Sequence, residues 1–206
     1  GVQQVDVMIG TNPDADHIGG LVDVLAAFPV KEVWVSGRPN TTVTFERFVD
    51  AVGRSGARGV VARRGDVIRL GSLEVKVLHP VDPLFPDRNN NSVVVRLELG
   101  QVSFLFTGDA ERLAEESMLR AGVPLRSTVL KVGHHGSRTS STPAFIAAVR
   151  PEVAVYQAGR DNEYGHPHRQ TLQTLQQFNV RVYGTDARGA IVVRPNGQPY
   201  QVATER

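Results

Sequence analysis

The stretch that decides the fold is T-N-P-D-A-D-H-I-G-G-L, residues 11–21. It places Asp14, Asp16 and His17 within four positions. An apolar run before it predicts a strand over residues 5–9, and an amphipathic run after it predicts a helix over residues 18–28. Two carboxylates and an imidazole on one short turn either cap the helix or hold a metal ion. Both interpretations are open at this point.

Short apolar strands and amphipathic helices alternate along the rest of the chain. Further helices are predicted over residues 41–52, 110–121, 142–149 and 170–178. Further strands are predicted over residues 32–35, 58–62, 67–70, 73–78, 93–99, 102–107, 128–132, 153–156, 181–183, 190–194 and 200–203. Many short strands in mixed sheets, with helices between them and no internal repeat, predict one α/β domain over residues 1–206.

The composition is that of a globular protein, since 41% of the 206 residues are hydrophobic. The formal net charge of +2 neither requires nor excludes a nucleic-acid partner. The chain has no cysteine, so any metal ion must be held by His, Asp, Glu or Asn. No apolar run approaches the ~18 residues of a membrane span and no signal peptide opens the sequence, so we expect a soluble chain.

Chemistry-bearing residues recur where predicted strands end. His134 and His135 follow the strand that ends L-K-V, and His166 and His168 lie in the loop Y-G-H-P-H. Asp109 closes the strand F-L-F-T-G-D. Ligands of α/β proteins gather at strand ends, so these side chains can converge although they are far apart in the sequence. Carboxylates and imidazoles together suit a hard or borderline divalent ion.

Each of these features alone also has an ordinary structural interpretation. Asp14 and Asp16 could cap one helix, Asp109 could cap another, and G-H-P-H could be a simple turn. His79, at the end of V-K-V-L-H-P, is interpreted as structural. The coincidence of the other features at strand ends favours a metal site.

The motifs in their order resemble a known family. N-P-D-A-D-H-I-G-G looks like the H-x-H-x-D-H signature of the metallo-β-lactamase superfamily, and F-L-F-T-G-D resembles the strand that delivers its metal-bridging aspartate. L-K-V-G-H-H-G-S-R-T-S-S, Y-G-H-P-H and G-T-D-A-R-G-A-I-V-V are similar to the carboxy-terminal domain of the ComEC/Rec2 family of DNA-uptake proteins. The resemblance, over residues 5–193, implies an αββα sandwich. The family's opening strands have no counterpart here, which implies a trimmed chain.

The resemblance also implies a site for two divalent ions, with Asp109 bridging them. The implied ligands are Asn12, Asp14, Asp16, His17, Asp109 and His135. The family's leading histidine is replaced by Asn12, and its additional histidine is absent, with N-N-N-S (89–92) near its place. Because an amide oxygen is a weaker ligand than imidazole, we expect Mn²⁺ to be favoured over Zn²⁺, although Zn²⁺ also suits the site.

By the same resemblance, the site would hydrolyse a phosphodiester. The residues expected to act in catalysis are Asp16, Lys131, His134, His166 and His168. Lys131 would supply a cation if its side chain faces the site, and His166 or His168 would protonate the leaving oxygen. The residues expected to contact phosphate are Ser137, Arg138, Thr139 and Ser140, although S-R-T-S-S is also a plausible turn and helix cap.

The implied function is degradation of DNA during uptake, with single-stranded DNA as partner and the chain tethered to a membrane channel domain on the extracytoplasmic face. A hydrolase of the same fold acting on a small ester or lactone is a second interpretation. A deep apolar pocket would favour the ester, and an open groove lined by arginines would favour DNA. A degenerate domain that only binds metal or DNA, through the change at Asn12, is a third.

Overall fold

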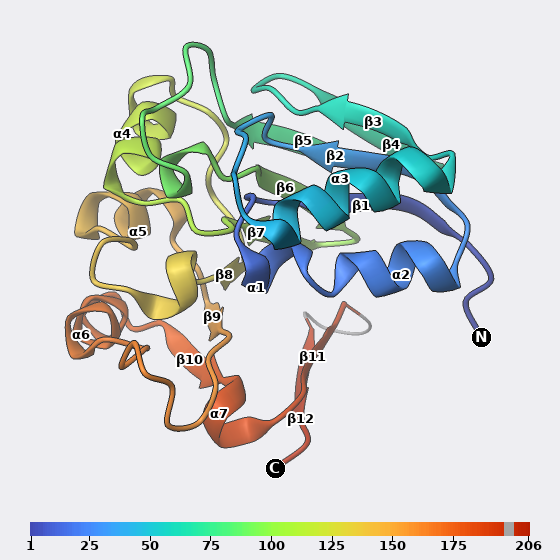
Figure 1. Cartoon of the computed structure of the whole chain (residues 1–206). Coiled ribbons are helices and arrows are strands. Elements are labelled where there is room, and N and C mark those ends of the chain that lie inside the picture. The colour runs from blue at the N-terminus through green and yellow to red at the C-terminus, as the bar shows by residue number, and fades with distance from the viewer. Residues whose placement is uncertain (196–199) are drawn as a thin grey trace.

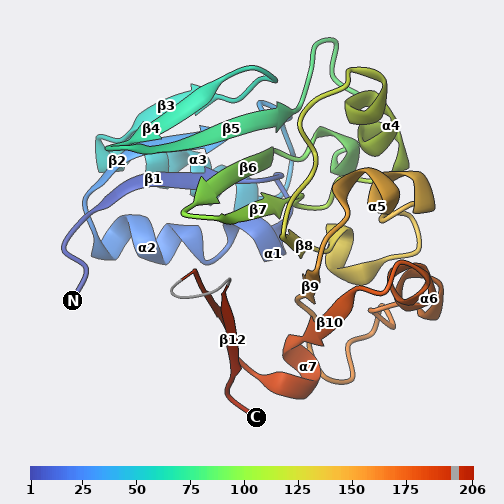
Figure 2. The same cartoon turned by 180° about the vertical axis from the view of Figure 1, so that it is seen from behind.

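The computed structural model describes residues 1–195 and 200–206. Within these residues the strands form a three-stranded sheet, a seven-stranded sheet and a two-stranded hairpin. Helices lie on the outer faces of the two larger sheets (Figure 1), and the view from behind shows the same layers (Figure 2). This mixed α/β sandwich confirms the predicted fold class.

The first sheet contains three parallel strands, which are β1 (Val5–Gly10), β2 (Val30–Val35) and β3 (Arg58–Val61). The helices α2 (Leu21–Ala27) and α3 (Val43–Ser55) cover its outer face. Met8, Val33 and Phe48 are buried in that layer. The inner face packs on the second sheet through Trp34, Ile68, Val75 and Val95, which bury apolar surface between the sheets.

The second sheet is antiparallel at one end and parallel at the other. Its strand order is β10-β9-β8-β7-β6-β5-β4. The strands are β4 (Val67–Leu70), β5 (Leu73–His79), β6 (Val94–Leu99), β7 (Val102–Phe106), β8 (Val129–Lys131), β9 (Val153–Tyr156) and β10 (Arg181–Gly184). Because β7, β8 and β9 run parallel, their carboxyl ends meet at one edge of the sheet.

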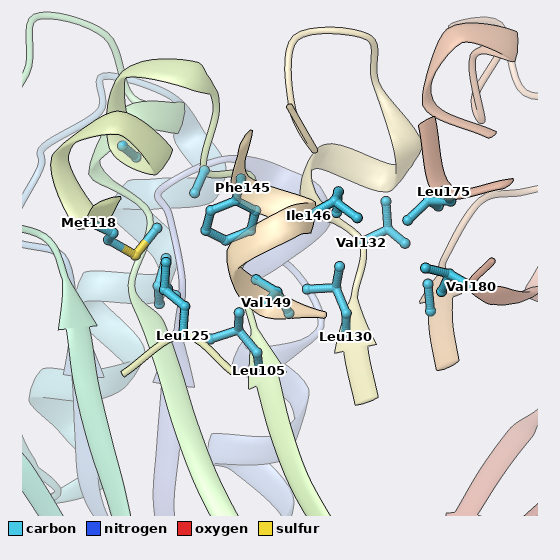
Figure 3. Close-up of a cluster of buried hydrophobic side chains, with 14 of the residues drawn as sticks. Leu105, Met118, Leu125, Leu130, Val132, Phe145, Ile146, Val149, Leu175 and Val180 are labelled. Atoms are coloured by element: carbon cyan, nitrogen blue, oxygen red, sulfur yellow. The ribbon is translucent and has the colours of Figure 1, made fainter. Parts of the chain in front are cut away.

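Three helices cover the outer face of this sheet, namely α4 (Arg112–Arg120), α5 (Pro143–Val149) and α6 (Arg169–Gln177). Figure 3 shows Met118 and Phe145 of these helices against Leu105 and Leu130 of β7 and β8. All four side chains are buried. Truncating one such side chain to alanine typically costs about 2–5 kcal/mol. The loops that follow β7 and β8 are therefore anchored on a packed scaffold.

The carboxy-terminal hairpin covers part of the inner face of the second sheet. It consists of β11 (Ile191–Arg194) and β12 (Gln201–Thr204), and the short α7 (Thr185–Arg188) precedes it. Val193 and Val202 pack on Val102, Val129 and Val153. Val102 and Val129 lie on the opposite face of the sheet from Leu105 and Leu130, which Figure 3 shows. None of the helices in the described part of the chain is long and apolar enough to cross a membrane.

The predicted helix over residues 18–28 is wrong in one respect, because two helices replace it. The first, α1 (Ala15–Ile18), begins earlier than predicted, and Gly19 and Gly20 separate it from α2. Two consecutive glycines lower helix propensity by about 1 kcal/mol each, which favours a break here. Asp14 occupies the amino-terminal cap position of α1, but its side chain makes no capping hydrogen bond.

Candidate metal centre

Four side chains meet at the strand ends of the sandwich, and we call them the metal cluster. Asp16 and His17 lie in α1, directly after β1. Asp109 follows β7, and His135 follows β8 in the 3₁₀ turn η2 (Gly133–Gly136). One potential ligand atom from each residue lies within 4.8 Å of the others. The structure therefore brings together four of the six predicted ligands.

The ligand atoms of the metal cluster face one another. Nε2 of His17 lies 3.0 Å from Oδ2 of Asp109 and 3.4 Å from Oδ2 of Asp16. Nε2 of His135 lies 3.1 Å from Oδ2 of Asp16 and 3.5 Å from Oδ1 of Asp109. Two carboxylates and two imidazoles that converge in this way form a ligand set for a borderline divalent ion.

Outer hydrogen bonds orient both imidazoles toward the cluster. Nδ1 of His135 donates to the carbonyl of Gln157 over 2.8 Å, which leaves Nε2 as the ring atom available to an ion. Nδ1 of His17 lies 2.8 Å from Oγ1 of Thr11 and so is also occupied on its outer side. Partners of this kind are typical of metal-binding histidines, because they fix the tautomer and the direction of the ring.

Two buried atoms of the cluster lack a hydrogen-bond partner among the described residues, namely Nε2 of His17 and Oδ1 of Asp109. The 3.0 Å approach between the His17 and Asp109 side chains is not aligned as a hydrogen bond. A buried polar atom left unpaired costs about 1–3 kcal/mol. A divalent cation would satisfy both atoms at once, so the residues present fit a metal ion.

The electrostatics of the cluster favour a positive charge. Burial alone would lower the pKa of His17, but the carboxylates of Asp109 and Asp16 outweigh it and raise that pKa to about 9. The hydrogen bond with His135 is the main cause that lowers the pKa of Asp16. Burial opposes ionisation of Asp109, yet His17 and Lys131 hold its pKa below the usual value. A metal ion entering here would displace the proton of His17.

The backbone of the H-H-G-S loop is strained where it delivers its histidines. His134 has φ 46° and His135 has φ 54°, both in the left-handed region that side chains disfavour. The turn is held by a hydrogen bond from the His134 amide to the Gly108 carbonyl, and by another from the Ser137 amide to the His134 carbonyl. Strain of about 1–3 kcal/mol at such residues is characteristic of functional sites.

Two neighbours position Asp109. Its amide donates to Oγ of Ser92 over 3.1 Å. The ammonium of Lys131 lies 3.7 Å from its Oδ1 and donates to the Gly108 carbonyl. Lys131 thus faces the site, where burial lowers its pKa although the charges of Asp109 and Asp16 act against that shift.

His134 lies beside the cluster and is paired with Glu111. Its Nδ1 donates to Oε1 of Glu111 over 2.9 Å, and its Nε2 lies 3.9 Å from Oδ2 of Asp109. Burial opposes the charged imidazole, but the bond to Glu111 and the charge of Asp109 raise the pKa of His134. Thr139 also donates to Oε1 of Glu111, over 2.9 Å. The arrangement favours the protonated form of His134, next to the cluster.

Asn12 and Asp14 lie outside the cluster. The amide oxygen of Asn12 accepts the Asp14 backbone N–H over 3.0 Å, and the Asn12 side chain is buried. The Asp14 carboxylate pairs with Arg88 over 2.8 Å and accepts from Asn40 over 3.2 Å. Both partners of Asp14 bond to Oδ1, and the Asn12 oxygen keeps a second lone pair, but neither side chain lies in the metal cluster, so their metal role stays a prediction.

The two histidines of Y-G-H-P-H differ in surroundings. The ring of His166 lies 5.5 Å from that of His134 and 6.3 Å from that of His135, centroid to centroid. Nδ1 of His168 accepts the Arg138 backbone N–H over 3.0 Å, which ties two loops together. His166 is thus the nearer of the two to the cluster, and its catalytic role, like that of His168, stays a prediction.

The residues predicted to contact phosphate also divide. Ser137 and Ser140 are buried. Oγ of Ser137 bonds to Oγ1 of Thr139, and Oγ of Ser140 donates to the Ala110 carbonyl. Phosphate contacts from these two hydroxyls would require the internal bonds to break. Arg138 is exposed at the mouth of the loop.

Three residues that shape the site were not predicted from the sequence, namely Thr11, Ser92 and Glu111. Each contacts a cluster residue or His134 through one hydrogen bond. Thr11 and Ser92 lie within or beside the sequence motifs, but the spacing of a hydroxyl residue does not indicate which partner it will bond to. The signal for Glu111 was its position two residues after Asp109, before the helix begins.

The chain is similar in sequence to known proteins along most of its length. The family model described as the metallo-beta-lactamase superfamily matches residues 1–160. "ComE operon protein 3" of Bacillus subtilis is 36% identical over 94% of this chain and 25% of its own length. "Competence protein ComA" of Neisseria gonorrhoeae is 31% identical over 93% and 25%. The chain therefore spans about a quarter of the length of these relatives.

Among solved structures, the fold is similar to that of CmlA, described as a diiron beta-hydroxylase from Streptomyces venezuelae. The TM-score is 0.63 and the identity 13%, over 98% of this chain and 45% of that one. At this identity the likeness shows the fold alone.

Proposed function

The chain belongs to the metallo-β-lactamase superfamily, and on that premise we propose that it is a metal-dependent phosphodiesterase that degrades DNA during uptake. The observation that carries the proposal is the metal cluster, in which two oriented imidazoles and two carboxylates converge. The resemblance to relatives named for competence supports the setting in DNA uptake. The tether to a membrane channel, and the extracytoplasmic face, are part of the same proposal.

The chain's own residues would divide the chemistry among them. A divalent ion bound at the cluster would polarise the phosphodiester and make water in the site more acidic. Lys131 places a cation 3.7 Å from Asp109, where it would offset charge that develops on the phosphate. Glu111 accepts from Nδ1 of His134 and fixes its ring, and in the charged imidazole that Glu111 and Asp109 favour, Nε2 would donate a proton to the leaving oxygen.

The surroundings of the cluster favour DNA over a small ester. An open groove of about 390 Å³ is lined by the guanidinium groups of Arg38 and Arg88, which suit phosphates, and by the carboxylates of Asp87 and Glu111. The apolar cavity of about 210 Å³ lies behind Asn12, against Phe45 and Phe48, and none of its lining residues belongs to the cluster. Glu111 borders this groove and bonds to His134, so a strand bound there would pass next to His134.

The cluster supplies donors for one ion. A second ion, as predicted from the resemblance, would need the side chains of Asn12 and Asp14. Calorimetric titration with Mn²⁺ and with Zn²⁺ measures the number of equivalents bound. We propose Mn²⁺ as the working ion, because carboxylate oxygens supply half of the ligands.

The test is incubation of the purified chain with end-labelled single-stranded DNA and Mn²⁺, with and without a chelator. Hydrolysis should require the ion and be lost in Asp109→Asn, which keeps the shape of the side chain. Asp23→Asn is the matched control, because Asp23 is exposed on α2, away from the cluster. Absence of cleavage with Mn²⁺ or Zn²⁺, together with turnover of a small ester, would refute the proposal in favour of the second interpretation.

A further inference from the structure

An aromatic side chain stands out beside the metal cluster. Tyr164, in the loop between β9 and α6, is 72% exposed. Its ring lies over that of His166, with centroids 5.9 Å apart and 23° between the planes. The ring of His166 is in turn nearly parallel to that of His135, at 6.3 Å and 15°. Three rings therefore lead from the cluster to the surface.

The loop that presents Tyr164 is held in place by one side chain. Nδ2 of Asn162 donates to the carbonyls of Gly159 and His166, and Oδ1 of Asn162 accepts the His166 amide. These bonds close the loop on both sides of Tyr164. A ring that is held before a ligand arrives loses little conformational freedom on binding.

The charges beside His166, on which the Tyr164 ring stacks, indicate which chemical group can bind here. His166 walls a hollow of about 530 Å³ that contains Arg160 together with the carboxylates of Asp161 and Asp186. Two carboxylates beside one cation disfavour a phosphate in this hollow. A flat neutral ring has no such conflict, and the face of Tyr164 that is turned to solvent is open to it.

We propose that Tyr164, supported by His166, forms a stacking site for a nucleobase of the DNA strand that crosses the metal cluster. This inference rests on the proposed function and deepens it, because it makes the chain selective for single strands. A base inside a duplex is covered by its neighbours on both faces, whereas a base of a single strand can stack on an exposed ring. Every base has such a face, so the site would not select sequence.

The experiment measures binding without cleavage, on the full chain in the presence of a chelator. Single-stranded oligonucleotides carry the fluorescent base 2-aminopurine at successive positions. At one position the bound strand should show quenched fluorescence. Tyr164→Ala should abolish this quenching and weaken binding of the single strand by roughly fivefold to 150-fold, as expected for one stacked base. Tyr164→Phe, which keeps the ring, should recover both.

Two comparisons make the result specific. Phe28→Ala removes another exposed aromatic ring at the end of α2, 37% exposed and away from the site, and should change neither quenching nor affinity. Binding of a blunt duplex should be equally weak with Tyr164 and with Tyr164→Ala. Two results would overturn the stacking site. The wild-type chain and Tyr164→Ala could bind the single strand with equal affinity, or Tyr164→Ala could lose equal affinity for single strand and duplex.

The outcome separates this inference from the proposed function. Quenching that depends on Tyr164, in a protein that shows no hydrolysis with any divalent ion, would refute the catalytic proposal alone. If both the wild-type chain and Tyr164→Ala hydrolyse single strands with the same KM, the stacking site alone would be refuted.

Discussion

Lowering the pH from 7 to 4 should destabilise the chain through His79. This side chain is fully buried at the end of β5, where its Nε2 donates to the Asn90 carbonyl over 2.7 Å and its ring stacks on Phe85. Burial lowers the pKa of His79 to about 4, although the bond to Asn90 acts against that shift. The folded protein therefore keeps this imidazole neutral at pH values where the unfolded chain is charged.

The sign and size of the effect follow from linkage. Between pH 6.5 and about 4 the unfolded chain binds a proton at His79 and the folded chain does not, so the free energy of unfolding falls as the pH falls. The two pKa values, 6.5 and about 4, give a loss of about 3 kcal/mol over that window. The loss is absent above pH 6.5 and complete near pH 4.

The assay is urea unfolding at a series of pH values, with chelator present throughout. His79→Gln is the comparison, because glutamine can still donate to the Asn90 carbonyl but does not titrate. The difference between the two proteins isolates this residue from the other acidic groups. The wild-type chain should lose about 3 kcal/mol more than the variant between pH 6.5 and 4. Parallel pH profiles, or a His79 resonance that titrates near 6.5, would refute the reasoning.

Three other changes have expected outcomes. Glu115→Ala should lower the free energy of unfolding in urea by about 3 kcal/mol, because it leaves buried N–H groups at the start of α5 unpaired. Glu116→Ala is the control, since Glu116 is half exposed, and it should lower that free energy by under about 0.5 kcal/mol. Gly136→Ala should weaken Mn²⁺ binding, measured by calorimetry, because it displaces η2. Gly136 has φ +88°, and a Cβ added there would lie 2.7 Å from the Cβ of Pro167. Asp16→Asn should weaken Mn²⁺ binding by about tenfold or more, because Asp16 belongs to the metal cluster. Asp14→Asn should weaken it much less, because Asp14 pairs with Arg88. Equal losses of affinity in the two variants would favour the site for two ions.

The strands could be predicted closely because period-two apolar patterns locate them directly. The bounds of β4 and β9 match the prediction, and those of most other strands agree within one or two residues. The helix after β1 was predicted as one piece, because the apolar pattern continues through Gly19 and Gly20. The apolar pattern indicates which faces of an element are buried, but it does not indicate where the backbone bends at glycine residues.

The site could be predicted less completely, because a motif gives residue types and their order but not where each side chain points. Asp14 and Asp16 are separated by one residue, yet Asp16 belongs to the cluster and Asp14 pairs with Arg88, 74 positions away. That ion pair depends on the loop before β6 folding back onto the loop after β1, which no local pattern encodes. His134 and His135 are adjacent in the same way, with one paired to Glu111 and the other in the cluster.

The direction of each side chain, more than its ligand type, also bears on how many ions the site could hold. Asn12 carries an oxygen that could bind a metal, and one of its two lone pairs already accepts the Asp14 amide. If the Asn12 oxygen turned away from the Asp14 amide, that backbone N–H would be left unpaired, at a cost of about 1–3 kcal/mol. The cluster residues gain by binding an ion, since two of their buried atoms are unpaired. One ion therefore relieves a cost already present in the fold, whereas a second ion would relieve none at Asn12 and Asp14, whose polar groups already have partners.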